Sequence, residues 1–126
     1  WARITALPGT GDGFHLYVRL QSPGSSAAGG YRLRAERRSG TDQVFLQRMT
    51  DGAVTTLATF GRELATGDTF VLRARGSTLE AWARSGSTWT KLGSAADSTY
   101  SGPGRVGVGI DDKQCRLDDF GARSLP

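Results

Sequence analysis

Paired carboxylates are the first feature to consider, because retaining glycoside hydrolases need two carboxyl groups about 5 Å apart. The three glutamates, Glu36, Glu63 and Glu80, lie in different segments, and none has a carboxylate two residues away. Asp118 and Asp119 are adjacent, so on a strand their side chains would point to opposite faces. The chain also contains no nucleophile-elbow sequence. The sequence therefore predicts a protein that is not an enzyme.

The acidic residues near the C-terminus offer another chemistry, the binding of a hard cation. Asp111 and Asp112 end one predicted strand, and Asp118 and Asp119 lie in the next, so a hairpin would bring two or three of these carboxylates together. Calcium prefers carboxylate and carbonyl oxygens, which makes these four residues the candidate metal ligands. The alternative is that 111–113 form a turn and that Asp118 or Asp119 pairs with an arginine.

Aromatic and arginine side chains offer a third chemistry, the binding of a polymer. An exposed indole or phenol is a flat apolar surface for the C–H face of a sugar ring, and guanidinium groups suit carboxylates, phosphates and sulfates. The alternative is a solvated sheet face whose arginine stems cover apolar surface. The candidate ligand-binding residues, placed outward or at a rim by the pattern, are Trp82, Tyr17, Arg19, Arg32, Arg34, Arg73, Arg75, Arg84 and Tyr100.

Two of the tryptophans need separate assignment. If 85–87 form the centre of a hairpin, Ala83 lies opposite Trp89, and Trp82 lies opposite Thr90. The two indoles would then lie on opposite faces of the sheet. We expect Trp89 in the core and Trp82 on the outer surface.

The elements that must position these residues are strands, because apolar and polar residues alternate with period two along most of the chain. Short glycine-containing turns separate the strands and favour antiparallel pairing. The best helical candidate is a single turn at 61–66, and 93–104 forms a long connection. The predicted strands are 3–7, 14–21, 31–36, 43–49, 53–60, 69–75, 79–84, 88–92, 105–110 and 116–123.

Length and composition limit the partners. The chain of 126 residues suits one domain, and it has no stretch of about 18 apolar residues that would span a membrane. The net charge of +4 is modest and acids are interspersed with the arginines, which argues against nucleic acid. The single cysteine, Cys115, excludes an internal disulfide and is expected in the core. The chain begins with Trp1, so we expect it to be part of a larger protein.

A family resemblance starts at Tyr31. The hairpin YRLRAERRSGTDQVFLQRM is followed by GDTFVLRARGSTLEAWARSGSTWTKLG, DSTYSGPGRVGVGI and RLDDFGA. This order resembles the laminin G-like, or concanavalin A-like, jelly-roll superfamily, and in particular modules of actinobacterial secreted proteins and of minor tail proteins from phages of such bacteria. The resemblance implies two curved sheets with neighbouring chain ends, and roles in glycan binding or adhesion, with calcium held in some members. Hydrolases of this superfamily place Glu, Asp and Glu at alternating positions on one strand, a pattern that is missing here.

Together these observations predict an all-β, two-sheet antiparallel jelly-roll sandwich of about ten strands, a single domain over 1–126. The predicted function is a non-catalytic module of a secreted or virion-surface protein, with a glycan or cell-wall polymer and neighbouring domains as partners. No cofactor is required, and a structural calcium ion stays open. The alternative is a structural subunit of a virion or extracellular appendage that acts through protein contacts, including self-association, without binding sugar.

Overall fold

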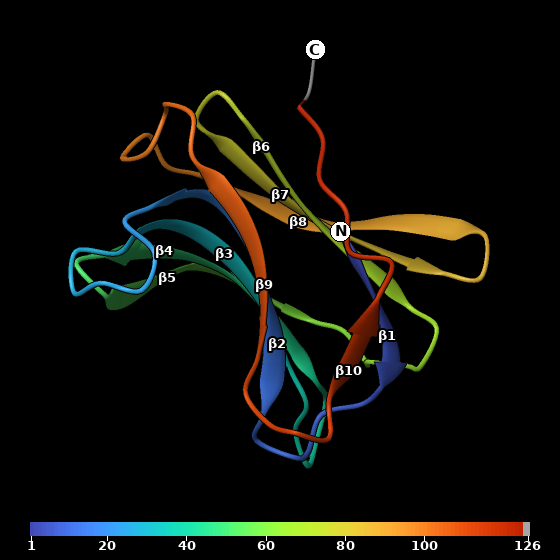
Figure 1. Cartoon of the computed structure of the whole chain (residues 1–126). Coiled ribbons are helices and arrows are strands. Elements are labelled where there is room, and N and C mark those ends of the chain that lie inside the picture. The colour runs from blue at the N-terminus through green and yellow to red at the C-terminus, as the bar shows by residue number, and fades with distance from the viewer. Residues whose placement is uncertain (125–126) are drawn as a thin grey trace.

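The computed structural model describes residues 1–124, and this part of the chain contains ten strands and no helix (Figure 1). No helix of a length and hydropathy suited to crossing a membrane is therefore found among these residues. The strands are β1 (Ala2–Ala6), β2 (Gly13–Gln21), β3 (Gly29–Glu36), β4 (Gln43–Thr50), β5 (Ala53–Gly61), β6 (Thr69–Arg75), β7 (Thr78–Ser85), β8 (Thr88–Ala96), β9 (Arg105–Ile110) and β10 (Arg116–Asp118).

The strands form two five-stranded antiparallel sheets, which confirms the predicted two-sheet sandwich. The β6 sheet has the order β10-β1-β6-β7-β8, and the β3 sheet has the order β5-β4-β3-β2-β9. The two chain ends meet in the β6 sheet, where β1 pairs with β10 and the amino group of Trp1 donates to the carbonyl oxygen of Gly121 at 2.8 Å. Figure 1 shows the C-terminal segment passing beside the N-terminus.

The core lies between the sheets and follows the predicted alternation. Phe14 on β2 and Phe70 on β6 are fully buried, and their rings meet edge to face with centroids 5.4 Å apart, so this pair joins the two sheets. Leu33 and Leu79 are also fully buried. Cys115 is buried as expected, and burial raises the pKa of its thiol to about 11, which keeps it protonated at neutral pH.

Three boundaries differ from the sequence-based expectation. The segment 61–66 forms no helical turn, because the amide of Leu64 donates to the Asp42 carboxylate at 2.9 Å and the Leu64 side chain is buried between the sheets. Strand β8 continues to Ala96, so the long connection before β9 is shorter than predicted. Strand β10 ends at Asp118, because Asp119 adopts a left-handed conformation with φ 52°.

Candidate binding surfaces

The outer face of the β6 sheet carries both tryptophans in question. Along β7 the small Ala81 and Ala83 point into the core, so Trp82 and Arg84 between and beside them point outward. Cross-strand partners share a face, and Trp89 on β8 is the partner of Arg84. The guanidinium carbon of Arg84 lies 5.2 Å from the centroid of the Trp89 ring. The two indoles therefore lie on the same outer face.

The prediction that Trp89 lies in the core is wrong, since 47% of this residue is exposed. The turn between β7 and β8 has two residues rather than three: Ser85 pairs with Thr88, and Gly86 has the left-handed φ of 57° that such a turn requires. The one-residue change of register moves Trp89 and the following side chains up to Lys91 to the other face, and an irregularity in the ladder between Ala81 and Trp82 reverses this shift from Gly93 onward.

The Trp82 side chain is held in place by a charged cluster on the same face. Its indole nitrogen donates to the Glu80 carboxylate at 3.1 Å, and the same carboxylate pairs with Lys91 at 2.6 Å and Arg73 at 3.6 Å. The hydrogen bonds from Lys91 and Trp82 lower the pKa of Glu80. This carboxylate is therefore ionised and compensated, and it holds Trp82 against the sheet.

A hollow of about 1140 Å³, which we call the β6 groove, runs from this face around the edge of β6 to the margin of the core. Trp82 and Trp89 line it on the outer side, and Leu72 lines it on the inner side. Five arginines also line it: Arg19, Arg73, Arg75, Arg84 and Arg123. No aspartate or glutamate of residues 1–124 is among its lining residues. The groove therefore suits an anionic occupant.

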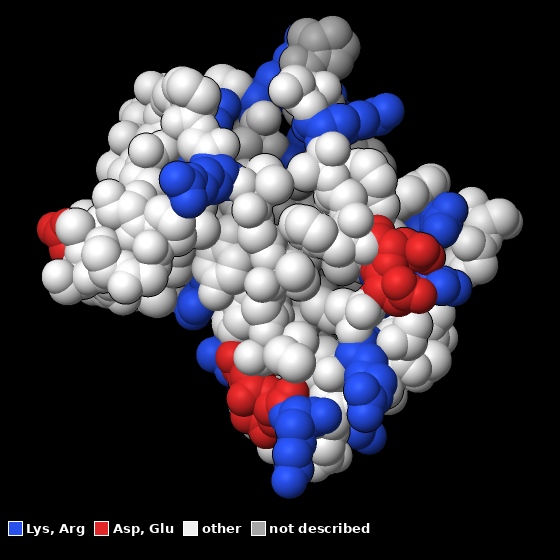
Figure 2. Space-filling model, viewed as in Figure 1, with Lys and Arg blue, Asp and Glu red and all other residues white. Residues whose placement is uncertain are grey.

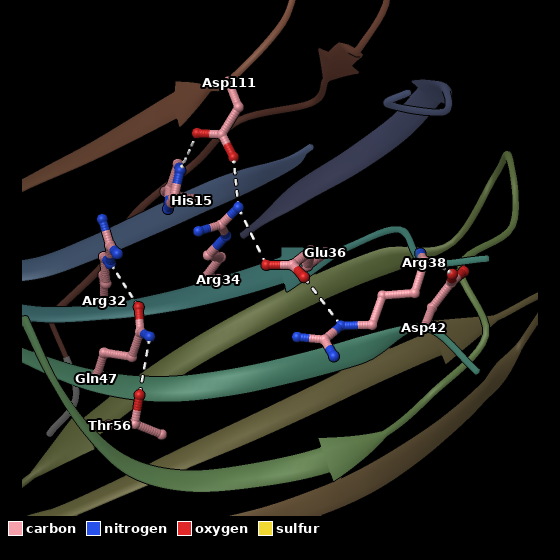
Figure 3. A network of polar contacts seen from close by, with 9 residues as sticks. All are labelled: His15, Arg32, Arg34, Glu36, Arg38, Asp42, Gln47, Thr56 and Asp111. Atoms are coloured by element: carbon pink, nitrogen blue, oxygen red, sulfur yellow. Dashed lines mark hydrogen bonds and ion pairs between the residues drawn. The ribbon is translucent and has the colours of Figure 1, made fainter. Parts of the chain in front are cut away.

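The outer face of the β3 sheet carries a different kind of surface, a network of polar contacts (Figure 3). His15 Nε2 and the Asp111 carboxylate are 2.6 Å apart, and Arg34 donates to Asp111 at 3.0 Å and pairs with Glu36 at 3.1 Å. Burial lowers the pKa of His15, and the bond to Asp111 offsets part of this effect. The charges of the network compensate one another within the sheet.

The other two candidates on this face are also engaged with their neighbours. Arg32 donates to the side-chain oxygen of Gln47 at 2.7 Å, and Gln47 in turn donates to the hydroxyl of Thr56 at 3.1 Å (Figure 3). The ring of Tyr17 stacks on His15 with centroids 5.8 Å apart. These side chains bind across strands β2 to β5 and so stiffen the sheet.

Arg19 and Tyr100 lie at the rim between the sheets. One guanidinium nitrogen of Arg19 donates to the carbonyl oxygens of Gly76 at 2.6 Å and Tyr100 at 2.9 Å, so it ties the β6–β7 turn to the segment before β9. The Tyr100 ring packs edge to face on Tyr31 at 5.7 Å. The nine predicted ligand-binding residues thus divide among three places. Only Arg73, Arg75, Trp82 and Arg84 belong to the β6 sheet.

The four carboxylates predicted as metal ligands do not converge. The Asp112 carboxylate accepts hydrogen bonds from the amides of Gly9 at 2.8 Å and Cys115 at 2.9 Å. Arg3 pairs with Asp119 at 2.8 Å and with Asp118 at 3.6 Å, and Asp111 belongs to the His15 network. Across residues 1–124, no three His, Cys, Asp or Glu side chains are placed to hold a metal ion. The four carboxylates therefore do not form a common set of ligands among these residues.

The chain matches no protein-family model, and neither a curated protein nor a solved structure matches it significantly. The resemblance to laminin G-like modules therefore stays a prediction. The sandwich itself rests on the structure alone.

One exposed surface was missed by the sequence analysis. Val108 and Ile110 on β9 are the cross-strand partners of the inward-facing Leu16 and Phe14 of β2, and Val106 precedes them on the same face of β9, yet each of the three is between 42% and 48% exposed. They are exposed because β9 is an edge strand that the β6 sheet does not cover. Figure 2 shows an uncharged area over β9. Period-two alternation predicted the facing of these residues, but only the strand order shows that they meet solvent.

Proposed function

We propose that this chain is a non-catalytic recognition module that binds an acidic cell-surface polysaccharide on the outer face of the β6 sheet. One observation carries the proposal: Trp82 and Trp89 point outward together, in a groove whose lining among residues 1–124 includes five arginines and no aspartate or glutamate. A larger secreted or virion-surface protein would use such a module for attachment.

The chemistry of this face fits a charged sugar chain. The exposed indole of Trp89 offers a flat apolar surface to the C–H face of a pyranose ring. Arg84 stacks on that indole and keeps guanidinium donors for a uronic carboxylate or a sulfate. Because side chains alone provide both kinds of contact, the proposed recognition requires no cofactor.

Affinity electrophoresis with polygalacturonate, and with neutral dextran as the uncharged comparison, tests the proposal. We expect retardation by polygalacturonate only, and a loss of about tenfold in affinity for Trp89→Ala and for Arg84→Ala. Arg38→Ala is the matched control, because Arg38 stacks over Phe45 at 5.6 Å in the same way on the other sheet. Equal losses for Arg38→Ala and Arg84→Ala would show unspecific charge attraction and contradict the proposal.

A structural subunit is the second candidate, and the apolar row of β9 favours it. An edge strand with exposed Val106, Val108 and Ile110 has unpaired backbone groups that a neighbouring chain could cover. Light scattering over a range of protein concentrations separates the two candidates. A monomer that binds polygalacturonate supports the recognition module, and an oligomer that dissociates in Val108→Asp and binds no polysaccharide supports the subunit.

A further inference from the structure

Strand β6 lacks a partner along most of one edge. Strand β7 pairs with the whole of β6, from Thr69 to Arg75. On the other side β1 reaches only Thr69 and Phe70. The same register places Trp1 opposite Val71, so within residues 1–124 the free edge runs from Leu72 to Arg75.

The backbone groups on this edge point into the β6 groove. The amide of Ile4 donates to the carbonyl oxygen of Asp68 at 2.9 Å, so Asp68 directs its hydrogen-bonding groups toward β1. These groups alternate between the two sides of a strand, so those of Leu72 and Ala74 also point to the β1 side. Both residues line the groove. An extended chain lying in the groove would meet an N–H and a C=O from each of them.

The walls of the groove select the side chains of such an occupant. Leu16 and Val18 of β2 and Val106 of β9 form an apolar wall on the inner side, facing Leu72 and Ala74. On the outer side of the groove, Arg73 and Arg75 of β6 would be the cross-strand neighbours of an added strand. An occupant in antiparallel register would therefore place apolar residues opposite 72 and 74, and acidic residues opposite 73 and 75.

We propose that the free edge of β6 takes up an extended acidic peptide of a partner protein, which adds an antiparallel strand in line with β1. About four residues, at 3.3–3.4 Å each, cover the edge, and their pattern is acidic-apolar-acidic-apolar from the position opposite Arg75 to that opposite Leu72, followed by a polar residue where the peptide meets Trp1. This site goes beyond the proposed polysaccharide surface, since it uses the backbone edge and inner wall of the groove and not the indoles.

Nuclear magnetic resonance titration of the ¹⁵N-labelled chain with acetyl-Glu-Val-Glu-Val-Thr-amide tests the proposal. We expect the amide signals of 72–75 to shift and the amides of Leu72 and Ala74 to become protected from hydrogen exchange. The peptide Val-Glu-Val-Glu-Thr has the same composition, but it places carboxylates against the apolar wall, so we expect about tenfold weaker binding. Methylation of the amide nitrogen of the second valine removes the donor to Leu72 and should have a similar effect.

A charge exchange adds a control within the protein. Arg75→Glu should weaken binding of the acidic peptide, and a Lys-Val-Glu-Val-Thr peptide should restore it. Trp89→Ala should bind the peptide as tightly as the unchanged chain does, although it should bind the polysaccharide more weakly. A failure of the peptide proposal can therefore be told apart from a failure of the polysaccharide proposal. Equal binding of all three acidic peptides, or shifts confined to the β9 edge, would overturn the proposal. Shifts of 72–75 that depend on protein concentration without peptide would assign the edge to a second copy and overturn it as well.

Discussion

Asp97 shows what a single carboxylate does at the residue scale. Its oxygens accept hydrogen bonds from the hydroxyl of Tyr31 at 2.7 Å and from Arg48 at 2.6 Å, and one also accepts the amide of Thr99 at 2.9 Å. Burial acts to raise the pKa of Asp97, but these donors outweigh it and lower the pKa to about 2. The ionised carboxylate thus fixes the segment after β8 to β3 and β4.

The lowered pKa of Asp97 predicts a defined acid sensitivity. As the pH falls, the unfolded chain takes up this proton first, near its ordinary pKa of 3.8, so the stability that Asp97 contributes is complete above about pH 4. That contribution disappears as the pH approaches 2. Urea unfolding between pH 6 and 2 should therefore show a difference between the unchanged chain and Asp97→Asn that shrinks below pH 4. The exposed turn residue Asp51 provides the control Asp51→Asn, and a difference for Asp97→Asn that stays constant with pH would contradict the assignment.

At the scale of elements, the β7–β8 hairpin decides which side chains are available. Because Trp89 lies on the outer face, its removal opens no cavity in the core. We expect Trp89→Ala to lower the free energy of unfolding by less than about 1 kcal/mol, whereas Phe70→Ala, at a fully buried ring, should cost about 3–5 kcal/mol. Denaturant unfolding of both variants measures this contrast. Equal large losses of unfolding free energy in both variants would show that Trp89 lies in the core, and they would contradict the proposed binding face.

The same hairpin shows how far sequence reasoning reaches. Alternation placed Leu79, Ala81 and Ala83 in the core and Trp82 outside, because small and apolar residues alternate with large polar ones along β7. The facing of Trp89 depended instead on whether the turn has two or three residues, and 85–88 permit both. Local pattern therefore predicted each strand, but not the register across a turn.

The sequence pattern also does not predict which strands pair when they lie far apart along the chain. Strand β2 pairs with β9, and β1 pairs with β6 and β10, although these partners lie far apart along the chain. The candidate arginines consequently could not be assigned to one sheet, and the structure places them on two. The His15 network depends on such a pairing, since Asp111 follows β9 and reaches His15 only because β9 lies beside β2.

For the whole molecule, the two sheets present outer faces of opposite character. The β3 sheet binds its charges internally, through Asp111, Arg34 and Glu36. The β6 sheet leaves a groove of arginines without a carboxylate, and next to it β6 and β9 each leave a strand edge without a partner among residues 1–124. Apart from Arg73, which pairs with Glu80, the groove arginines have no carboxylate partner among residues 1–124, so this charge and the unpaired backbone lie in one region, where we place both proposed ligands.

The carboxylate contacts near the C-terminus lead to a prediction for calcium. Asp112 accepts two backbone amides, and Asp118 and Asp119 pair with Arg3, so calcium would compete with contacts that the chain already makes at these carboxylates. A ligand that binds the folded chain raises its melting temperature by mass action. We therefore expect the same melting temperature with excess calcium and with excess EDTA. Asp112→Asn should lower the melting temperature equally in both buffers, because it weakens the backbone bonds of the β9–β10 connection. A rise with calcium that EDTA reverses, and that Asp112→Asn abolishes, would instead establish a calcium site at this connection.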